Sequence, residues 1–162
     1  MKALVTYYTQ TGNTGKVAKA IYEAISIEKV LIPIAELKDQ GGYDIVFVGF
    51  PVHAHSVPAE AETFIKGLPK DQRVAFFSTH GSMRGGHLPK QAFEHALGVA
   101  AKNKVLGHFG CRGKVDPNII EALINKPAHK AWAEEAQGAE RHPDNHDLAD
   151  AREFAQGIIA AL

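Results

Sequence analysis

Apolar residues are distributed along this chain in two patterns. Continuous apolar runs predict strands of a parallel sheet, because such strands are covered on both faces. Five runs of this kind cover residues 2–7, 30–34, 44–50, 74–77 and 104–111. Apolar residues spaced three or four positions apart predict helices with one buried face. These stretches cover about residues 14–26, 58–68, 91–97 and 147–162, so strands and helices alternate along the chain.

This alternation indicates an α/β fold in which right-handed crossovers join parallel strands. The second apolar run contains Pro33, which cannot donate a hydrogen bond to a neighbouring strand, so we expect that strand at an edge. Residues 112–147 do not fit the alternation, and helical patterns at 118–124 and 128–137 indicate an extension before the last helix. We expect this extension to lie on the surface and to pack Trp132 into the core, with docking of a partner as the alternative.

The segment that follows the first strand is rich in hydroxyl groups. The first N–H groups of a helix have no partner inside it, and with the positive end of the helix dipole they attract a phosphate. Threonine hydroxyls and an asparagine amide add donors here, and a glycine permits a tight turn. This first loop (residues 9–14) therefore predicts a phosphate site. Its residues are Thr9, Gln10, Thr11, Gly12, Asn13 and Thr14.

Two common nucleotide motifs do not match the first loop. A nucleoside triphosphate loop needs Gly-x-x-x-x-Gly-Lys followed by Ser or Thr. Here Lys16 is followed by Val17, and Gln10 stands where the first glycine is required. The dinucleotide fingerprint Gly-x-Gly-x-x-Gly does not occur in the chain. Uncharged donors suit a phosphate monoester rather than a triphosphate.

The first loop resembles the FMN phosphate loop of the flavodoxin-like family, whose pattern is Thr/Ser-x-Thr-Gly-x-Thr, and the resemblance extends over most of the chain. It implies a doubly wound sheet of five parallel strands in the order 2-1-3-4-5, with helices on both faces. It also implies FMN as cofactor and redox chemistry, mostly electron transport or the reduction of quinones and related acceptors. We expect residues 1–162 to form a single flavodoxin-like domain, with residues 112–147 as a helical extension within it.

The resemblance assigns the flavin ring to two further loops, which follow the third and fourth strands. The second loop (residues 51–58) should run along the dimethylbenzene side of the ring, with His53 or His55 as the stacking aromatic group. The third loop (residues 79–86) should meet the pyrimidine end through main-chain N–H groups. The residues assigned to the cofactor in these two loops are Pro51, Val52, His53, Ala54, His55, Thr79, His80, Gly81, Arg84, Gly85 and Gly86.

Both ring loops depart from the family pattern. The second loop lacks the tryptophan of many flavodoxins, and no glycine lies between Pro51 and Pro58, so a positive φ is costlier there. The third loop lacks the tyrosine that often covers the ring. His80 and Arg84 stand instead where positive charge would stabilise an anionic reduced flavin, in which case Arg84→Ala would lower the reduction potential. The alternative for Arg84 is an exposed loop charge.

Composition limits the other classes of function. The 18 basic and 18 acidic residues balance, so no net field favours nucleic acid or an anionic membrane. No apolar run approaches the roughly 20 residues that span a bilayer, and the N-terminus lacks a signal-peptide pattern. The single cysteine, Cys111, fits a small buried apolar role and a reducing compartment, so we expect a cytoplasmic protein.

Histidines and carboxylates near the last helix have the side-chain types of metal ligands. His142, Asp144, His146 and Asp147 lie within six residues, but they do not form a strong metal motif. We therefore expect no metal and interpret residues 142–144 as the capped start of the last helix.

Three functions remain open at this stage. The first is an electron carrier that works with a redox partner protein, either a reductase or an acceptor. The second is an FMN-dependent oxidoreductase that passes hydride from a nicotinamide to a quinone or another small acceptor, and a homo-oligomer remains open for it. The third is a non-redox interaction module on the same fold. Carrier flavodoxins are typically acidic, whereas this chain has a net charge of +0, so a carrier would have to dock through local contacts. No second nucleotide fingerprint for a nicotinamide is present, and on this ground we favour the first function by a small margin.

Overall fold

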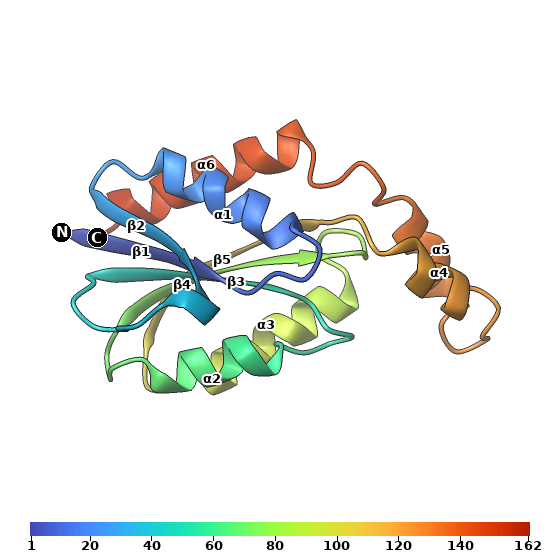
Figure 1. Ribbon diagram of the computed structural model, residues 1–162, viewed down its shortest axis with the longest axis horizontal. Coiled ribbons are helices and arrows are strands. Elements are labelled where there is room, and N and C mark those ends of the chain that lie inside the picture. Colours follow the sequence, from blue (N-terminus) through green and yellow to red (C-terminus); the bar gives the residue numbers. More distant parts are fainter.

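A sheet of five parallel strands is the centre of the structure, a computed structural model that describes residues 1–162 (Figure 1). The strands are β1 (Lys2–Tyr7), β2 (Glu28–Pro33), β3 (Ile45–Pro51), β4 (Arg73–His80) and β5 (Lys104–Arg112). Their order is β2-β1-β3-β4-β5, which confirms the order expected from the resemblance. β2 is an edge strand, as Pro33 predicts.

Four helices cover the two faces of this sheet. They are α1 (Asn13–Ala24), α2 (Ala59–Gly67), α3 (His87–Val99) and α6 (Asn145–Ala160). Figure 1 shows α1 and α6 on one face and α2 and α3 on the other. A short 3-10 turn, η1 (Ile34–Glu36), follows β2. None of the helices has the length and hydropathy required to cross a membrane.

The two faces of the sheet carry separate apolar cores, because successive side chains of a strand point to opposite faces. On β3, Phe47 packs in the core beneath α1 and α6, whereas Val46 and Val48 pack in the core beneath α2 and α3. All three side chains are fully buried. This two-sided burial explains why the strands read as continuous apolar runs rather than as alternating ones.

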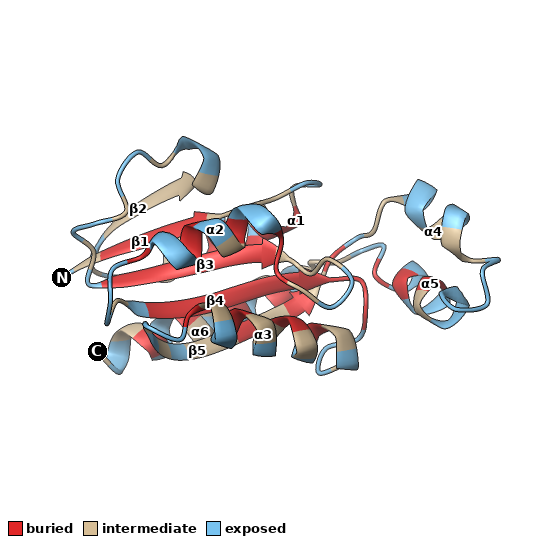
Figure 2. Ribbon diagram, turned by 90° about the horizontal axis from the view of Figure 1, so that it is seen from below, coloured by how far each residue is buried: buried red, intermediate tan, exposed pale blue.

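An extension of two short helices, α4 (Pro117–Leu123) and α5 (Lys130–Gln137), lies between β5 and α6. Figures 1 and 2 show it at the end of the molecule away from both termini, apart from the buried strands. Trp132 is half-buried on α5 and belongs to neither apolar core. The expectation that this side chain packs into the core was wrong, because the extension contacts Gly81, directly after the carboxyl end of β4, rather than a face of the sheet.

Two elements are longer than the apolar pattern predicts. α3 begins at His87, four residues before the predicted start, and Pro89 lies in its first turn, where no N–H group is required. β4 continues through Thr79 to His80, because these polar residues pair with Cys111 and Arg112 of β5. The third loop therefore starts as strand, which fixes its first two side chains in a ladder.

Candidate functional site

The first loop presents main-chain donors that no protein group uses. Gly12 occupies the position before α1 with φ 91°, and no side chain caps the helix there. The hydroxyl oxygen of Thr9 accepts a hydrogen bond from the Gly12 N–H group at 3.0 Å. The N–H groups of Asn13, Thr14 and Gly15 have no hydrogen-bond partner in the protein. Three adjacent free donors at a helix N-terminus fit a phosphate group.

Two side chains of the first loop are already engaged by distant residues. The Asn13 amide donates to the Lys114 carbonyl at 2.8 Å and to the Thr11 hydroxyl at 3.2 Å. The hydroxyls of Thr14 and Thr79 lie 2.9 Å apart in a buried hydrogen bond. Asn13 therefore holds the loop in shape, and the donors that remain for a phosphate are mainly those of the main chain.

The second loop folds into a tight turn with its tip exposed. His53 and Ser56 exchange two main-chain hydrogen bonds of 3.1 and 2.9 Å, and Ala54 and His55 form the exposed tip. Ala54 has φ 56°, whereas glycine is usual at the first central position of a two-residue turn with this geometry. The positive φ that the sequence makes costly is thus present in the structure, at a residue with a Cβ.

The two histidines of the second loop have different environments. The His53 ring is half-buried, its Nε2–H group donates to Oε1 of Gln10 at 2.9 Å, and it meets the Tyr8 ring edge-on at 6.3 Å. His55 is exposed at the tip of the turn. The structure therefore joins the first and second loops through Gln10, a contact that sequence reasoning missed, and leaves His55 as the freer aromatic group.

The third loop begins with a histidine that is neutral at pH 7. His80 is 6% exposed, and its Nδ1–H group donates to the Ser82 carbonyl at 2.8 Å. Burial, together with the nearby guanidinium of Arg112, lowers the pKa of His80 to about 4. The positive charge that the sequence suggests at His80 is not available at neutral pH.

Arg84 in the third loop is bound on the α6 side of the sheet. Its Nη1 group lies 2.6 Å from a carboxylate oxygen of Asp150, and its Nε–H group donates to the Gly110 carbonyl at 3.0 Å. The guanidinium also lies over the Phe109 ring, 5.2 Å from the ring centroid. Its charge is thus paired within the protein, which supports the exposed structural charge more than a role beside the flavin.

The remaining glycines and strand ends bring the three loops into one region. Gly85 has φ 74°, and Gly86 follows it immediately before α3. The Val52 N–H group donates to the Thr79 carbonyl at 2.9 Å, which joins the second loop to the third, while Thr14 joins the first to the third. All three loops therefore meet at the carboxyl edge of the sheet, the edge where open α/β sheets bind ligands.

A fourth segment at this edge was missed as part of the site. Arg112 is the last residue of β5 and Lys114 follows it, and the Lys114 carbonyl accepts the hydrogen bond from the Asn13 amide described above. The Arg112 guanidinium donates to the carbonyls of Gly81 and Glu135, at 3.0 and 2.6 Å. Because β5 ends at the same edge as β1 and β4, the position of this segment after a parallel strand was the available signal.

The other candidate groups of the sequence have structural surroundings. Ligand atoms of His142, Asp144 and Asp147 lie within 4.8 Å of one another. Asp144 caps α6, Asp147 completes a reciprocal capping box, and His142 bonds to Asp147 at 2.6 Å, so their hydrogen bonds are those of a helix start. Cys111 is fully buried, and burial raises the pKa of its thiol to about 12.

Comparison with known proteins agrees with this geometry. The family model of the flavodoxin domain matches residues 4–156. A flavodoxin-like domain-containing protein, BilS, from Clostridioides difficile strain CD3 is 30% identical over 171 residues, covering 98% of this chain and 97% of that protein.

Solved structures share the fold at lower identity. Oxidised flavodoxin 2 from Bacillus cereus is 20% identical with a TM-score of 0.64, and each chain is covered completely. A flavoprotein from Lactobacillus acidophilus NCFM, solved in complex with FMN, is 22% identical with a TM-score of 0.53 over 67% of this chain and 92% of that one. Since the family model spans most of the sequence, this chain belongs to the flavodoxin domain family, a family of FMN-binding redox proteins.

Proposed function

We propose that this chain binds FMN at the three loops and transfers electrons between that cofactor and a protein partner. The observation that carries the proposal is the start of α1, where the N–H groups of Asn13, Thr14 and Gly15 have no protein partner. A helix N-terminus with free donors stabilises the charge of a phosphate. When bound, FMN supplies a group that accepts and releases electrons.

Each loop contributes a different part of the binding. The first loop holds the phosphate through main-chain N–H groups, and Asn13 keeps that loop in place through Lys114. The second loop borders the ring, with its exposed turn at Ala54 and His55 facing the incoming partner. The third loop provides main-chain contacts from Gly81 onward. His80 is buried and neutral, so it orients the loop through Ser82 and adds no charge.

A protein partner is favoured by what the chain does not contain. The sequence has no second nucleotide fingerprint that would bind a nicotinamide cofactor beside FMN. A reductase would therefore supply the electrons, and another protein would accept them. The balanced charge, 18 basic and 18 acidic residues, indicates that docking depends on local contacts rather than on a strongly acidic surface.

A second candidate is an FMN-dependent oxidoreductase that acts on a small acceptor. It is favoured by a cavity of about 530 Å³ between α4 and α5, whose wall contacts the third loop. Cavities of this size are common in small-molecule sites. The candidate differs from the carrier in one testable respect, because an enzyme would turn over without a second protein.

The first experiment measures binding and turnover with the purified protein. We expect the absorption spectrum of bound FMN and quenching of FMN fluorescence on titration. With NADH or NADPH and a quinone, a carrier should show no turnover above that of free FMN, and turnover should appear when a catalytic amount of a flavodoxin reductase is added. Robust turnover by the protein alone would favour the oxidoreductase, and a colourless protein that leaves FMN fluorescence unchanged would exclude both redox functions.

A further inference from the structure

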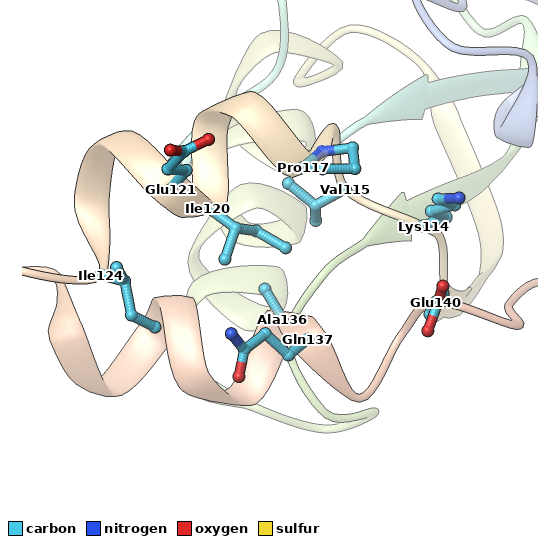
Figure 3. A pocket seen from close by; sticks show the side chains of 9 residues that line it. All are labelled: Lys114, Val115, Pro117, Ile120, Glu121, Ile124, Ala136, Gln137 and Glu140. Carbon is cyan, nitrogen blue, oxygen red and sulfur yellow. The ribbon is translucent and has the colours of Figure 1, made fainter.

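A cavity of about 530 Å³ lies between α4 and α5, outside the three loops assigned to the cofactor (Figure 3). Its size is within the range of small-molecule sites. Nine residues from the extension and the segment before α6 line it. They are Lys114, Val115, Pro117, Ile120, Glu121, Ile124, Ala136, Gln137 and Glu140.

The helix α4 is apolar but has no buried residue. Ile120 and Ile124 line the cavity and are only half-buried, and Ile119 on the outer side is 48% exposed. Isoleucine is among the residue types most often buried completely, because water disfavours its surface. A ligand in the cavity would cover Ile120 and Ile124 and would leave Ile119 unchanged.

The lining of the cavity combines apolar and polar side chains. Figure 3 shows Ile124 at one end, with Glu121 and Gln137 toward the same end, and the side chains of Lys114 and Glu140 at the other end. The Lys114 ammonium can donate hydrogen bonds, and Glu121 and Glu140 bring two carboxylates to the lining. A cationic ligand would meet the Lys114 ammonium, and an anionic ligand would meet the two carboxylates. An uncharged molecule with a hydrogen-bond acceptor meets no like charge and can accept from Lys114, so it fits this lining best.

We propose that this cavity binds an uncharged molecule with a ring system and one oxygen acceptor. The rings lie against Ile120 and Ile124, and the oxygen accepts a hydrogen bond from the Lys114 ammonium. The site is separate from the phosphate and ring loops, and its binding step requires no cofactor.

The wall of the cavity is packed against the third loop. A Cβ built on Gly81 would lie 2.5 Å from Cγ2 of Val115 and 3.3 Å from Cβ of Ala136, and both residues line the cavity. Arg112 joins the same two parts, because its guanidinium donates to the carbonyls of Gly81 and Glu135. Occupancy of the cavity therefore biases the third loop, and this coupling, unlike the binding itself, rests on the proposed FMN site.

The binding step is tested with 9-fluorenone, an uncharged tricyclic ketone, and with fluorene, which has the same rings without the oxygen. Trp132 is the single tryptophan of the chain and lies on α5, so its fluorescence reports binding to the FMN-loaded protein. We expect saturable binding, about tenfold tighter for 9-fluorenone because of the charged donor. Non-saturable binding, or equal affinity for both molecules, would overturn the assignment of the site.

Paired variants locate the ligand. Ile120→Gln should weaken 9-fluorenone binding at least about tenfold, whereas Ile119→Gln, on the adjacent exposed position, should leave it unchanged. Lys114→Met should remove the preference for the ketone over fluorene, and it keeps the main-chain carbonyl that Asn13 uses. Equal weakening by both glutamine variants would contradict the proposal and indicate an outer surface, such as one that a partner protein covers.

The coupling is tested by reciprocity. If 9-fluorenone changes the affinity for FMN by some factor, FMN must change the affinity for 9-fluorenone by the same factor. We expect this factor to differ from one. Arg112→Lys should bring the factor closer to one, because lysine cannot donate to both carbonyls in the fork geometry of arginine. A factor of one with intact 9-fluorenone binding overturns the coupling and leaves the cavity site supported. A chain that binds 9-fluorenone but no FMN refutes the proposed function and the coupling together.

Discussion

The first and third loops face the same edge of the sheet, but they use their polar groups in opposite ways. In the first loop, three main-chain N–H groups at the start of α1 have no protein partner. In the third loop, the side chains of His80 and Arg84 are bound by the carbonyl of Ser82 and the carboxylate of Asp150. A loop binds a ligand through the hydrogen-bond donors that have no partner within the protein. The number of polar residues in a loop does not show which of its donors are free.

The difference also decides the electrostatics of the site. His80 is uncharged at pH 7 because burial lowers its pKa to about 4, and Arg84 is neutralised by Asp150. The third loop therefore brings little free positive charge to a flavin, although its sequence contains two basic side chains. The first loop contains no ionised side chain and yet offers the stronger site for an anion, through oriented amides and the helix dipole.

The largest effect that separates the two loops concerns pH. Burial lowers the pKa of His80 to about 4, from an ordinary value of 6.5, and it lowers the pKa of His108 on the adjacent strand β5 by the same amount. Between pH 6.5 and 4 the unfolded chain binds protons that the folded chain excludes, so the free energy of unfolding falls as the pH falls. The loss is on the order of 3 kcal/mol per histidine, and it is absent above pH 6.5. Urea unfolding from pH 4 to 7.5 measures it.

Substitutions assign this pH dependence. His80→Gln and His108→Gln should each make the free energy of unfolding less dependent on pH in this range, because the uncharged amide takes up no proton. His87→Gln, at an exposed position of α3, should leave the slope unchanged. If His80→Gln and His87→Gln gave the same dependence of the free energy of unfolding on pH, a buried neutral His80 would not be the cause of that dependence.

The second prediction concerns the backbone of the first loop. Gly12 has φ 91° and a Cβ there would meet nothing within 4 Å, so Gly12→Ala changes only the backbone preference. We expect a loss of about 1 kcal/mol in stability and at least about tenfold in FMN affinity, because the free N–H groups turn away from the phosphate. FMN fluorescence quenching measures the affinity.

Gly42 provides a matched control for this change. Its φ is 81°, a Cβ there would also meet open space, and it lies far from the carboxyl edge. Gly42→Ala should cost a similar amount of stability and leave FMN affinity at the wild-type value. Loss of FMN affinity in both variants would mean that general destabilisation, rather than the geometry of the first loop, controls binding.

Sequence reasoning was most successful where the structure depends on neighbouring residues. The five strands follow from apolar runs, and the first loop follows from a hydroxyl-rich segment directly before a helix. Pro33 correctly predicted an edge strand. In each case the cause lies within a few residues of the effect, so the pattern contains the information.

The errors concern partners that are distant in sequence. Arg84 is 66 residues from Asp150, and Asn13 is 101 residues from Lys114, so no local pattern could pair them. Trp132 was expected in the core, but its helix contacts the third loop instead. The loop positions of the site could be anticipated from topology, whereas the state of each polar side chain required the fold.

The second loop gives the third prediction, because it lies between these two extremes. Ala54 has φ 56°, which costs an L-residue with a Cβ roughly 1–2 kcal/mol. Ala54→Gly removes that strain but increases the entropy of the unfolded chain, so we expect a net gain of about 0.5 kcal/mol in stability. Thermal unfolding measures it. His55→Gly, at a position with negative φ, should destabilise the protein, and a gain from both variants would contradict a strained turn.

The smallest expected effect tests whether Arg84 acts on the flavin at all. The Arg84–Asp150 pair is about half-exposed, with side-chain exposures of 44% and 48%, so its removal should change the free energy of unfolding by less than about 1 kcal/mol. Arg84→Ala leaves the Asp150 carboxylate unpaired and should lower the reduction potential of bound FMN slightly, whereas Asp150→Asn should raise it by a similar amount. The double variant restores the local charge balance, so its potential should return to that of the wild type if charge is the cause. A potential that falls with Arg84→Ala and stays low in the double variant would instead show that the arginine contacts the cofactor directly, which would give the third loop the role that its sequence first suggested.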